Sequence, residues 1–273
     1  MQAFEELVKI MARLRGPDGC PWDKAQDFST LPPYTIEETY ELVESIEAED
    51  WQELKGELGD LLFHIVFYAR IAAEKGLFGI EDVAQAAVDK MLRRHPHVFG
   101  GESIADPETL HKRWQHMKAQ ERRETAARER SPAWDAGVPS ALPALLWAYK
   151  LQQRAANLGF EWKDSAPVWD KFREECGELE QAVAAGVAEQ VTDEFGDVLF
   201  SLVNLSRFLD VNPENALRQA CLKFRNRLHL VWDHATTHAL DLQAMSEAEL
   251  EQLWESAKAE LERRQQEKRS PSA

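Results

Sequence analysis

Apolar residues along this chain recur every three or four positions, which is the spacing of amphipathic helices. The first series ends at Gly16 and consists of Leu7, Ile10, Met11 and Leu14. Runs that alternate apolar and polar residues between turn signals, as half-buried strands do, do not occur in the sequence. The pattern therefore predicts an all-α protein.

The same spacing predicts four more helices in the first half of the chain. After a GCPWD loop, a helix is expected to begin at Thr35, which would make Glu38 the third residue of a capping box. Two further helices are expected at about Trp51–Glu74 and Ile80–Arg94. The last is expected at Asp106–Arg123, because Asp followed by Pro is a typical helix start.

The helix expected at Trp51–Glu74 has two faces of different character. One is rich in leucine and is expected to be the buried face: Leu54, Leu58, Leu61, Leu62, Ile65 and Ala69. The other face combines acids with rings: Glu57, Asp60, His64 and Phe67.

In the second half, helix starts are indicated at Asn212, which precedes a proline, and at Ser246, which has Glu249 three residues later. Gly186 lies between two acidic segments and offers a place for the chain to fold back. Two antiparallel helices facing each other are therefore expected around it.

One acidic arrangement occurs twice in the chain. In each copy a Glu-Glu-x-x-Glu segment is followed by a Glu-x-Gly-Asp-x-Leu-Phe segment, with 16 residues from the last Glu of the first segment to the first Glu of the second. The acids are Glu38, Glu41, Glu57 and Asp60 in the first copy and Glu175, Glu178, Glu194 and Asp197 in the second. A constant offset of 137 residues relates the copies, which indicates an internal repeat.

The repeat predicts a tandem of two similar helical bundles of about five helices each. The expected domains are residues 1–125 and 142–265, joined by a linker at 126–141 that is rich in charge, Ser, Pro and Gly. Each half is long enough to form its own core.

The acids of each copy can form a metal site. Residues three apart on a helix point the same way, so a helical hairpin would bring four carboxylates together. Their repulsion requires a cation, and oxygen ligands suit Mg²⁺, with Mn²⁺ as the alternative. A solvated acidic face is the competing interpretation, since the chain holds 48 Asp and Glu residues.

Basic and aromatic residues also recur in both halves. Lys223 and Arg227 lie one helical turn apart, as do Trp254 and Lys258. Such residues can hold phosphates and stack a base. An exposed charged face and a tryptophan in the core are the alternatives.

Composition excludes several classes of protein. The formal net charge is −16 and the isoelectric point is near 5.0, so neither nucleic acid nor an anionic membrane is expected as the main partner. The three cysteines are Cys20, Cys176 and Cys221, and no C-x-x-C spacing occurs. Reduced thiols in a cytoplasmic protein are therefore expected.

At these residues the sequence resembles the MazG-type nucleoside triphosphate pyrophosphohydrolases, which belong to a superfamily of all-α NTP pyrophosphatases. The motifs that carry the resemblance are GCPWDK (19–24), PYTIEETYE (33–41), GELGDLLF (56–63), RRHPHVF (93–99), NLGFEW (157–162) and EFGDVLF (194–200). The resemblance implies hydrolysis of nucleoside triphosphates to monophosphates and pyrophosphate with Mg²⁺. It also implies a homodimer of tandem repeats in which the C-terminal repeat is the active one.

The second acidic set, Glu175, Glu178, Glu194 and Asp197, is therefore expected to hold the catalytic metal, and the first set a secondary one. Glu174 is the nearest spare carboxylate and is expected to act as a base or to support the metal ligands. Substrate contacts are expected from Asn204, Lys223, Arg227, Trp254 and Lys258. A non-catalytic helical scaffold is the alternative function.

Three differences between the repeats also favour the C-terminal site. Asn204 can exchange hydrogen bonds with a nucleotide, whereas Phe67 occupies the equivalent position in the first repeat. A serine at 201 stands where the first repeat has a histidine at 64, and an acid at 193 stands where it has a glycine at 56. The second site is therefore roomier and more acidic.

Overall fold

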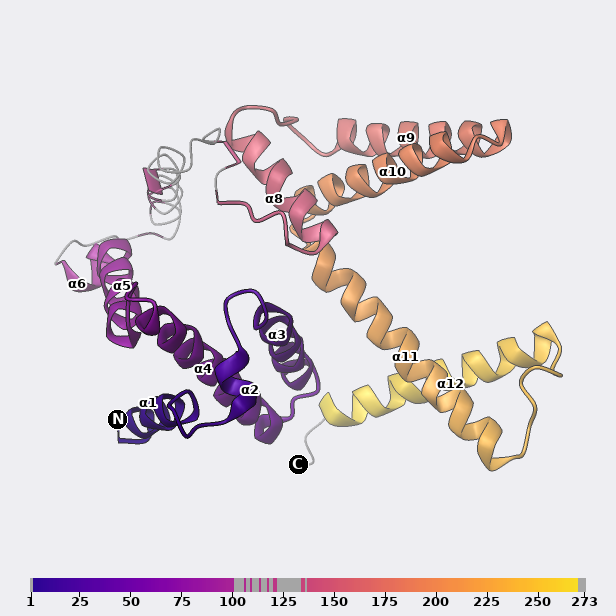
Figure 1. Ribbon diagram of the computed structural model, residues 1–273. Coiled ribbons are helices and arrows are strands. Elements are labelled where there is room, and N and C mark those ends of the chain that lie inside the picture. The colour runs from indigo at the N-terminus through magenta and orange to yellow at the C-terminus, as the bar shows by residue number, and fades with distance from the viewer. Residues whose placement is uncertain are drawn as a thin grey trace. The chain divides into compact units, whose positions relative to one another are not determined.

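The computed structural model describes residues 2–100 and 137–269, together with a few single positions between these ranges. Every regular element in this part of the chain is a helix, which confirms the all-α prediction. The chain divides into two compact units, Met1–Met117 and Lys118–Ala273, and each is described by itself (Figure 1).

The N-terminal unit is built around a helical hairpin. Helices α3 (Pro32–Glu47) and α4 (Trp51–Glu74) pack against each other, and α1 (Gln2–Leu14) packs against α4. Three further helices are α2 (Pro21–Ala25), α5 (Ile80–Arg94) and α6 (Pro96–Phe99). The fully buried core of this unit lies between α1 and α4 and contains Met11, Leu31, Val66, Phe67 and Ile71.

The predicted bounds of α4 and α5 are confirmed, but the predicted start of α3 is wrong. The helix begins at Pro32, because proline lacks an N–H and its fixed φ suits the first helical position. Thr35 lies inside the helix, where its Oγ1 is 3.0 Å from His64 Nδ1 and 2.8 Å from Tyr68 Oη. Glu38 therefore lies in the second turn, so a capping box does not explain this acid. The expected GCPWD loop likewise contains the short helix α2.

The prediction of the buried face of α4 is confirmed at Ala69, which is 2% exposed, and wrong at three of its six positions. Leu58, Leu62 and Ile65 are exposed, whereas Glu57, His64 and Phe67 are buried. Both faces carry apolar residues, so the periodicity alone does not reveal which one the other helices cover. Helices α1 and α3 cover the face of α4 that carries Phe67. The side chain of Glu57 therefore points toward α3, where it lies near Glu38 and Glu41.

The C-terminal unit contains five described helices: α8 (Ala144–Asn157), α9 (Ala166–Ala185), α10 (Ala188–Phe208), α11 (Pro213–Thr237) and α12 (Glu247–Arg269). Figure 1 shows α9 and α10 lying side by side as an antiparallel hairpin, and α11 crossing α12. Helix α8 contacts both α10 and α11.

The predicted turn and helix starts of this unit are confirmed. Gly186 ends α9 in the left-handed region with a φ of +71°. The side chain of Asn212 accepts a hydrogen bond from the backbone N–H of Asn215 at 3.1 Å. Ser246 and Glu249 exchange the hydrogen bonds of a capping box. Sequence signals at helix ends were therefore reliable here.

The expected linker at 126–141 lies mostly outside the described residues, as does most of the helix expected at Asp106–Arg123. Within that helix, the side chain of Asp106 accepts a hydrogen bond from the N–H of Thr109 at 2.7 Å, which fits the expected N-cap. The domain boundaries remain predictions.

Candidate active site

The α9–α10 hairpin brings acids of the second set together. Glu175 on α9 meets Glu194 and Asp197 on α10, and carboxylate oxygens of the three lie within 4.8 Å of one another. Glu175 is buried, Glu194 is half-buried and Asp197 is exposed. The cluster therefore opens to solvent at Asp197.

Glu178, the fourth acid of this set, is coupled to the cluster. The pKa of Glu178 is raised. The largest cause is partial desolvation of its carboxyl group, and the smaller causes are a hydrogen bond with Glu175 and the charges of Glu175 and Glu194. The side chain as a whole remains exposed, so solvent weakens these effects. Each of these causes disfavours a fourth negative charge, which a bound cation would offset.

Lys171 belongs to this site, although sequence reasoning missed it. Its Nζ lies 2.7 Å from an oxygen of Glu174 and 2.7 Å from an oxygen of Glu175. Hydrogen bonds to these two carboxylates raise the pKa of Lys171. The signal was its position three and four residues before the two acids, which puts all three on one helical face.

The first acidic set forms a similar cluster on α3 and α4. Oxygens of Glu38, Glu41 and Glu57 lie within 4.8 Å of one another. Burial, followed by the charges of Glu41 and Glu38, raises the pKa of Glu57. Burial, followed by the charge of Asp60, raises the pKa of Glu38.

Glu57 is the most enclosed acid of the first set. Its residue is 8% exposed, and its Oε2 is buried without a hydrogen-bond partner. In both repeats the atoms that could coordinate a metal ion are carboxylate oxygens. Mg²⁺ and Mn²⁺ favour such ligands, so the residues present fit these ions.

The predicted basic and aromatic residues meet between α11 and α12. The guanidinium of Arg227 lies over the ring of Trp254 at 5.7 Å, and the ring of Phe224 lies 5.4 Å from the same indole. Arg227 Nε is buried and has no hydrogen-bond partner. Lys223 is exposed, and Lys258 lies 3.4 Å from Glu255. The structure thus brings Arg227 and Trp254 together.

These residues and the carboxylates form two separate groups. Within the described residues, no hydrogen bond, ion pair or ring contact joins Lys223, Arg227, Trp254 or Lys258 to the acids of α9 and α10. The α11–α12 residues therefore make no direct contact with the candidate metal ligands.

Comparison with known proteins places both acidic sets in the same domain type. The family model of the MazG nucleotide pyrophosphohydrolase domain matches residues 26–99 and 168–232, and each match contains one complete set of four acids. The chain belongs to this family. The two matches also confirm the tandem repeat of helical bundles.

Two relatives extend the MazG resemblance over nearly the whole chain. A nucleoside triphosphate pyrophosphohydrolase of Escherichia coli (strain K12) is 42% identical over 261 residues, which cover 94% of this chain and 98% of the relative. The nucleoside triphosphate pyrophosphohydrolase/pyrophosphatase MazG of Thermotoga maritima is 43% identical over 255 residues, which cover 93% and 95%.

The predicted substrate contact Asn204 lies two turns beyond Asp197 on α10. Its side-chain oxygen accepts a hydrogen bond from Arg207 Nη1 at 2.7 Å, and Arg207 also pairs with Glu161. Arg207 and Glu161 therefore fix how the Asn204 amide is turned. Glu161 occurs in the NLGFEW motif of the sequence analysis without an assigned role, and Arg207 is not named there.

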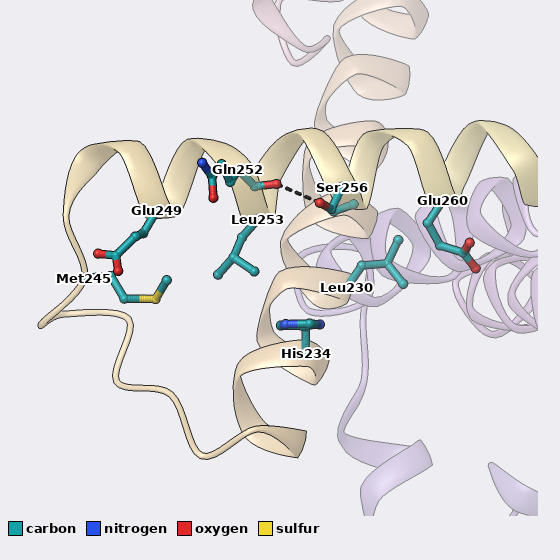
Figure 2. A pocket seen from close by; sticks show the side chains of 9 residues that line it. Leu230, His234, Met245, Glu249, Gln252, Leu253, Ser256 and Glu260 are labelled. Carbon is teal, nitrogen blue, oxygen red and sulfur yellow. Dashed lines mark hydrogen bonds between the residues drawn. The ribbon is translucent and has the colours of Figure 1, made fainter.

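A pocket of about 500 Å³ lies between α11 and α12, and none of the eight acids of the two sets lines it (Figure 2). Figure 2 shows His234 of α11 facing Leu253 of α12, and Ser256 donating a hydrogen bond to the Gln252 carbonyl at 2.8 Å. The pocket contains none of the predicted site residues, so we assign it no part in the candidate site. None of the described helices is long and apolar enough to cross a membrane.

Proposed function

We propose that this protein hydrolyses nucleoside triphosphates to nucleoside monophosphates and pyrophosphate at the α9–α10 carboxylates. The observation that carries the proposal is the convergence of Glu175, Glu194 and Asp197 within 4.8 Å, in a chain of the MazG family. The two relatives described above have names that state this activity.

In this proposal Glu175, Glu178, Glu194 and Asp197 hold Mg²⁺, with Mn²⁺ as the alternative. The bound ion would neutralise phosphate charge and lower the pKa of the attacking water. Water attack at the α-phosphorus forms one P–O bond and breaks the bond to the bridging oxygen, and pyrophosphate leaves. Glu174 accepts the proton of the water, either directly or through a second water.

Lys171 is a positioning residue in this scheme. In the structure its ammonium group bonds to both Glu174 and Glu175 and so fixes the two carboxylates relative to each other. The expected substrate contacts are Asn204, Lys223, Arg227, Trp254 and Lys258. Arg227 would supply positive charge for the phosphates, and the half-buried Trp254 ring would stack a base.

The C-terminal repeat is the proposed catalytic one. At the position equivalent to Asn204, the first repeat has Phe67, which is fully buried. His64 and its counterpart Ser201 are both 8% exposed, so burial at this pair does not separate the repeats and the difference rests on Asn204. A nucleotide therefore meets fewer polar groups beside the first acidic set.

We also propose a cytoplasmic homodimer. Both repeats leave the same three apolar positions exposed, 137 residues apart, and the exposed fractions match closely. They are Leu58 (53%), Leu62 (39%) and Ile65 (47%) in the first repeat and Phe195 (54%), Leu199 (40%) and Leu202 (46%) in the second. We call each set an apolar stripe. A second copy of the chain would cover these stripes and could bring its α11–α12 residues to the carboxylates.

The test of function is product analysis. Purified protein with Mg²⁺ and mixed nucleoside triphosphates should release pyrophosphate and not orthophosphate. Glu194→Gln/Asp197→Asn should abolish release, whereas Glu57→Gln/Asp60→Asn should retain most of it. The opposite pattern would move catalysis to the first repeat, and absence of both products from the wild type would favour the scaffold alternative.

A further inference from the structure

The side-chain amide of Asn204 on α10 is held in one orientation. Arg207 Nη1 donates a hydrogen bond to its Oδ1 at 2.7 Å. A guanidinium group carries only donors, so the atom of Asn204 that faces Arg207 must be the oxygen. The two N–H donors of Asn204 Nδ2 therefore remain for another partner.

These N–H donors are open to a ligand. Among the described residues, no acceptor pairs with them. Asn204 is half-buried, and its Nδ2 is not one of the buried polar atoms without a partner, so this nitrogen is accessible to solvent. Asn204 lies seven residues beyond Asp197 on the same side of α10, about 10 Å along the helix axis. A nucleotide with its phosphates at the carboxylates could therefore place its nucleoside beside Asn204.

Arg207 is itself held in place by Glu161. The two side chains form an ion pair that links α10 to the loop after α8, and the Arg207 side chain is 12% exposed. In this loop Gly159 has a φ of +95°, and the Phe160 N–H donates a hydrogen bond to the Ala155 carbonyl at 3.1 Å. This closure of the α8 end restricts where Glu161 can lie.

The first repeat uses its equivalent arginine differently. At the offset of 137, Arg70 corresponds to Arg207 and Phe67 to Asn204. Arg70 pairs with Glu74 of its own helix at 2.8 Å, and the fully buried Phe67 offers no amide. The combination of loop acid, arginine and amide therefore occurs in the second repeat and not at the equivalent positions of the first.

We infer that Arg207, held by Glu161, is a positioning residue that makes Asn204 a hydrogen-bond donor, and not an acceptor, toward the nucleoside. The site then selects nucleotides that offer an acceptor atom at this position, on the base or on the sugar. An amide that could turn freely would serve donors and acceptors alike and would discriminate less. The inference rests on the proposed function, because it takes the α9–α10 carboxylates as the place where the phosphates bind.

The test is steady-state pyrophosphate release from triphosphates that differ in one acceptor. UTP and ITP carry a base carbonyl where CTP and ATP carry an amino group, and deoxy forms lack one sugar hydroxyl at a time. Loss of the acceptor that Asn204 uses should lower kcat/KM about threefold to tenfold, mainly through KM. The base pairs and the sugar series tell which acceptor it is, and no loss in either would overturn the inference.

Asn204→Asp removes the donors while keeping the bond to Arg207. The selectivity that the wild type shows within a pair of triphosphates should therefore disappear in this variant. The added negative charge acts on every triphosphate alike, so it cancels in the ratio of kcat/KM values within a pair. Wild-type selectivity in Asn204→Asp would overturn the inference.

Arg207→Gln tests the positioning. A glutamine can donate or accept, so the Asn204 amide could pair with it in either orientation. Selectivity within a pair should therefore decrease, whereas Arg70→Gln, the same change at the equivalent position of the first repeat, should keep it. An equal loss of rate for all triphosphates would show a merely structural role and overturn the assignment. Asn204→Asp retains both bonds of Arg207 and keeps the test available if Arg207→Gln does not fold.

Calorimetric binding of the same triphosphates with Mg²⁺ separates this inference from the proposed function. If the wild type releases no pyrophosphate, the proposed function fails, whereas selective binding that depends on Asn204 and Arg207 would still support the inference. Release that depends on Glu194, without any selectivity that depends on Asn204, would do the reverse.

Discussion

Single residues differ in how far the sequence could predict them. The spacing within each repeat identified the acids, because three-residue and 16-residue separations recur at the offset of 137. Lys171 was missed because a lysine beside acids on a helix is common on exposed surfaces. The partnerless oxygen of Glu57 was also unpredictable, since burial depends on which helices cover α4.

The pH dependence of stability should reveal the buried acid Glu57. Its pKa is raised in the folded chain, so its favourable contribution is fully present below the ordinary value of 4.5 and is lost as the pH rises through the raised value. Without divalent cations, the melting temperature of Glu57→Gln minus that of the wild type should therefore increase as the pH rises from 5 to about 7.5.

Thermal melts in a chelator at several pH values measure this difference. Glu6→Gln is the control, because Glu6 is an exposed acid of α1 and is not among the groups that raise the pKa of Glu57. Mg²⁺ should abolish the advantage of Glu57→Gln, since the ion favours the charged carboxylate of the wild type. An advantage that is independent of pH would show that Glu57 is already neutral throughout this range.

Arg227 should matter for substrate more than for folding. Arg227→Ala removes a guanidinium that stacks on Trp254, and loss of one charge-assisted phosphate contact, about 1.5–3 kcal/mol, should lower kcat/KM roughly tenfold or more. Lys223→Ala and Lys258→Ala should act in the same direction. Lys9→Ala, an exposed lysine of the other unit, is the control for general charge effects.

Steady-state pyrophosphate release and thermal melts together decide this prediction. Exposed charges contribute little to stability, so the melting temperatures of the two lysine variants should stay close to wild type. Wild-type kinetics in all three variants would show that these residues form only a charged face.

At the scale of elements, helix existence and most helix ends were predictable, but buried faces were not. The bounds of α4 and α5 followed from caps and periodicity. The start of α3 was placed too late because Thr35 looks like an N-cap, whereas its hydroxyl is used inside the unit by His64 and Tyr68. The leucine face of α4 was expected to be buried, but no described helix of its own unit covers Leu58 and Leu62, which are exposed.

The α9–α10 hairpin should depend on the backbone of its turn. Gly186 has a φ of +71°, and a Cβ added there would meet no atom within 4 Å, so an alanine is disfavoured by backbone conformation alone. Gly186→Ala should destabilise the chain by about 1 kcal/mol. The measurement is urea unfolding, with the free energy taken from the midpoint and slope.

Gly177→Ala is the matched control for this turn. Gly177 lies inside α9, and a Cβ there also meets nothing within 4 Å. Alanine is favoured over glycine within a helix, so this variant should gain about 0.5–1 kcal/mol. Equal effects of the two substitutions would contradict the conformational explanation.

At the scale of the whole molecule, the repeat made the architecture predictable from sequence. Two copies of one acidic arrangement implied two similar bundles, and the helices and the two family matches confirm them. Whether one chain contains every residue of the site could not be predicted from the sequence. Spacing places residues on a helix, but it does not say whether α11 and α12 meet the acids of α9 and α10 in the same chain.

The apolar stripes make the assembly testable. The double substitution Phe195→Glu/Leu199→Glu puts charge into the stripe of the second repeat, where burial in an interface would cost several kcal/mol. Light scattering after size-exclusion chromatography should therefore show a monomer where the wild type gives a dimer. Leu158→Glu is the control, because Leu158 is 59% exposed and lies outside both stripes.

Activity of this monomer then tells how the site is completed. The described residues contain no contact between the α11–α12 residues and the carboxylates, so a dimer that supplies them should lose pyrophosphate release when it dissociates. Release should return with protein concentration if the variant still associates weakly. A folded monomer with wild-type kcat would show that one chain closes its own site, and the stripes would then need another explanation.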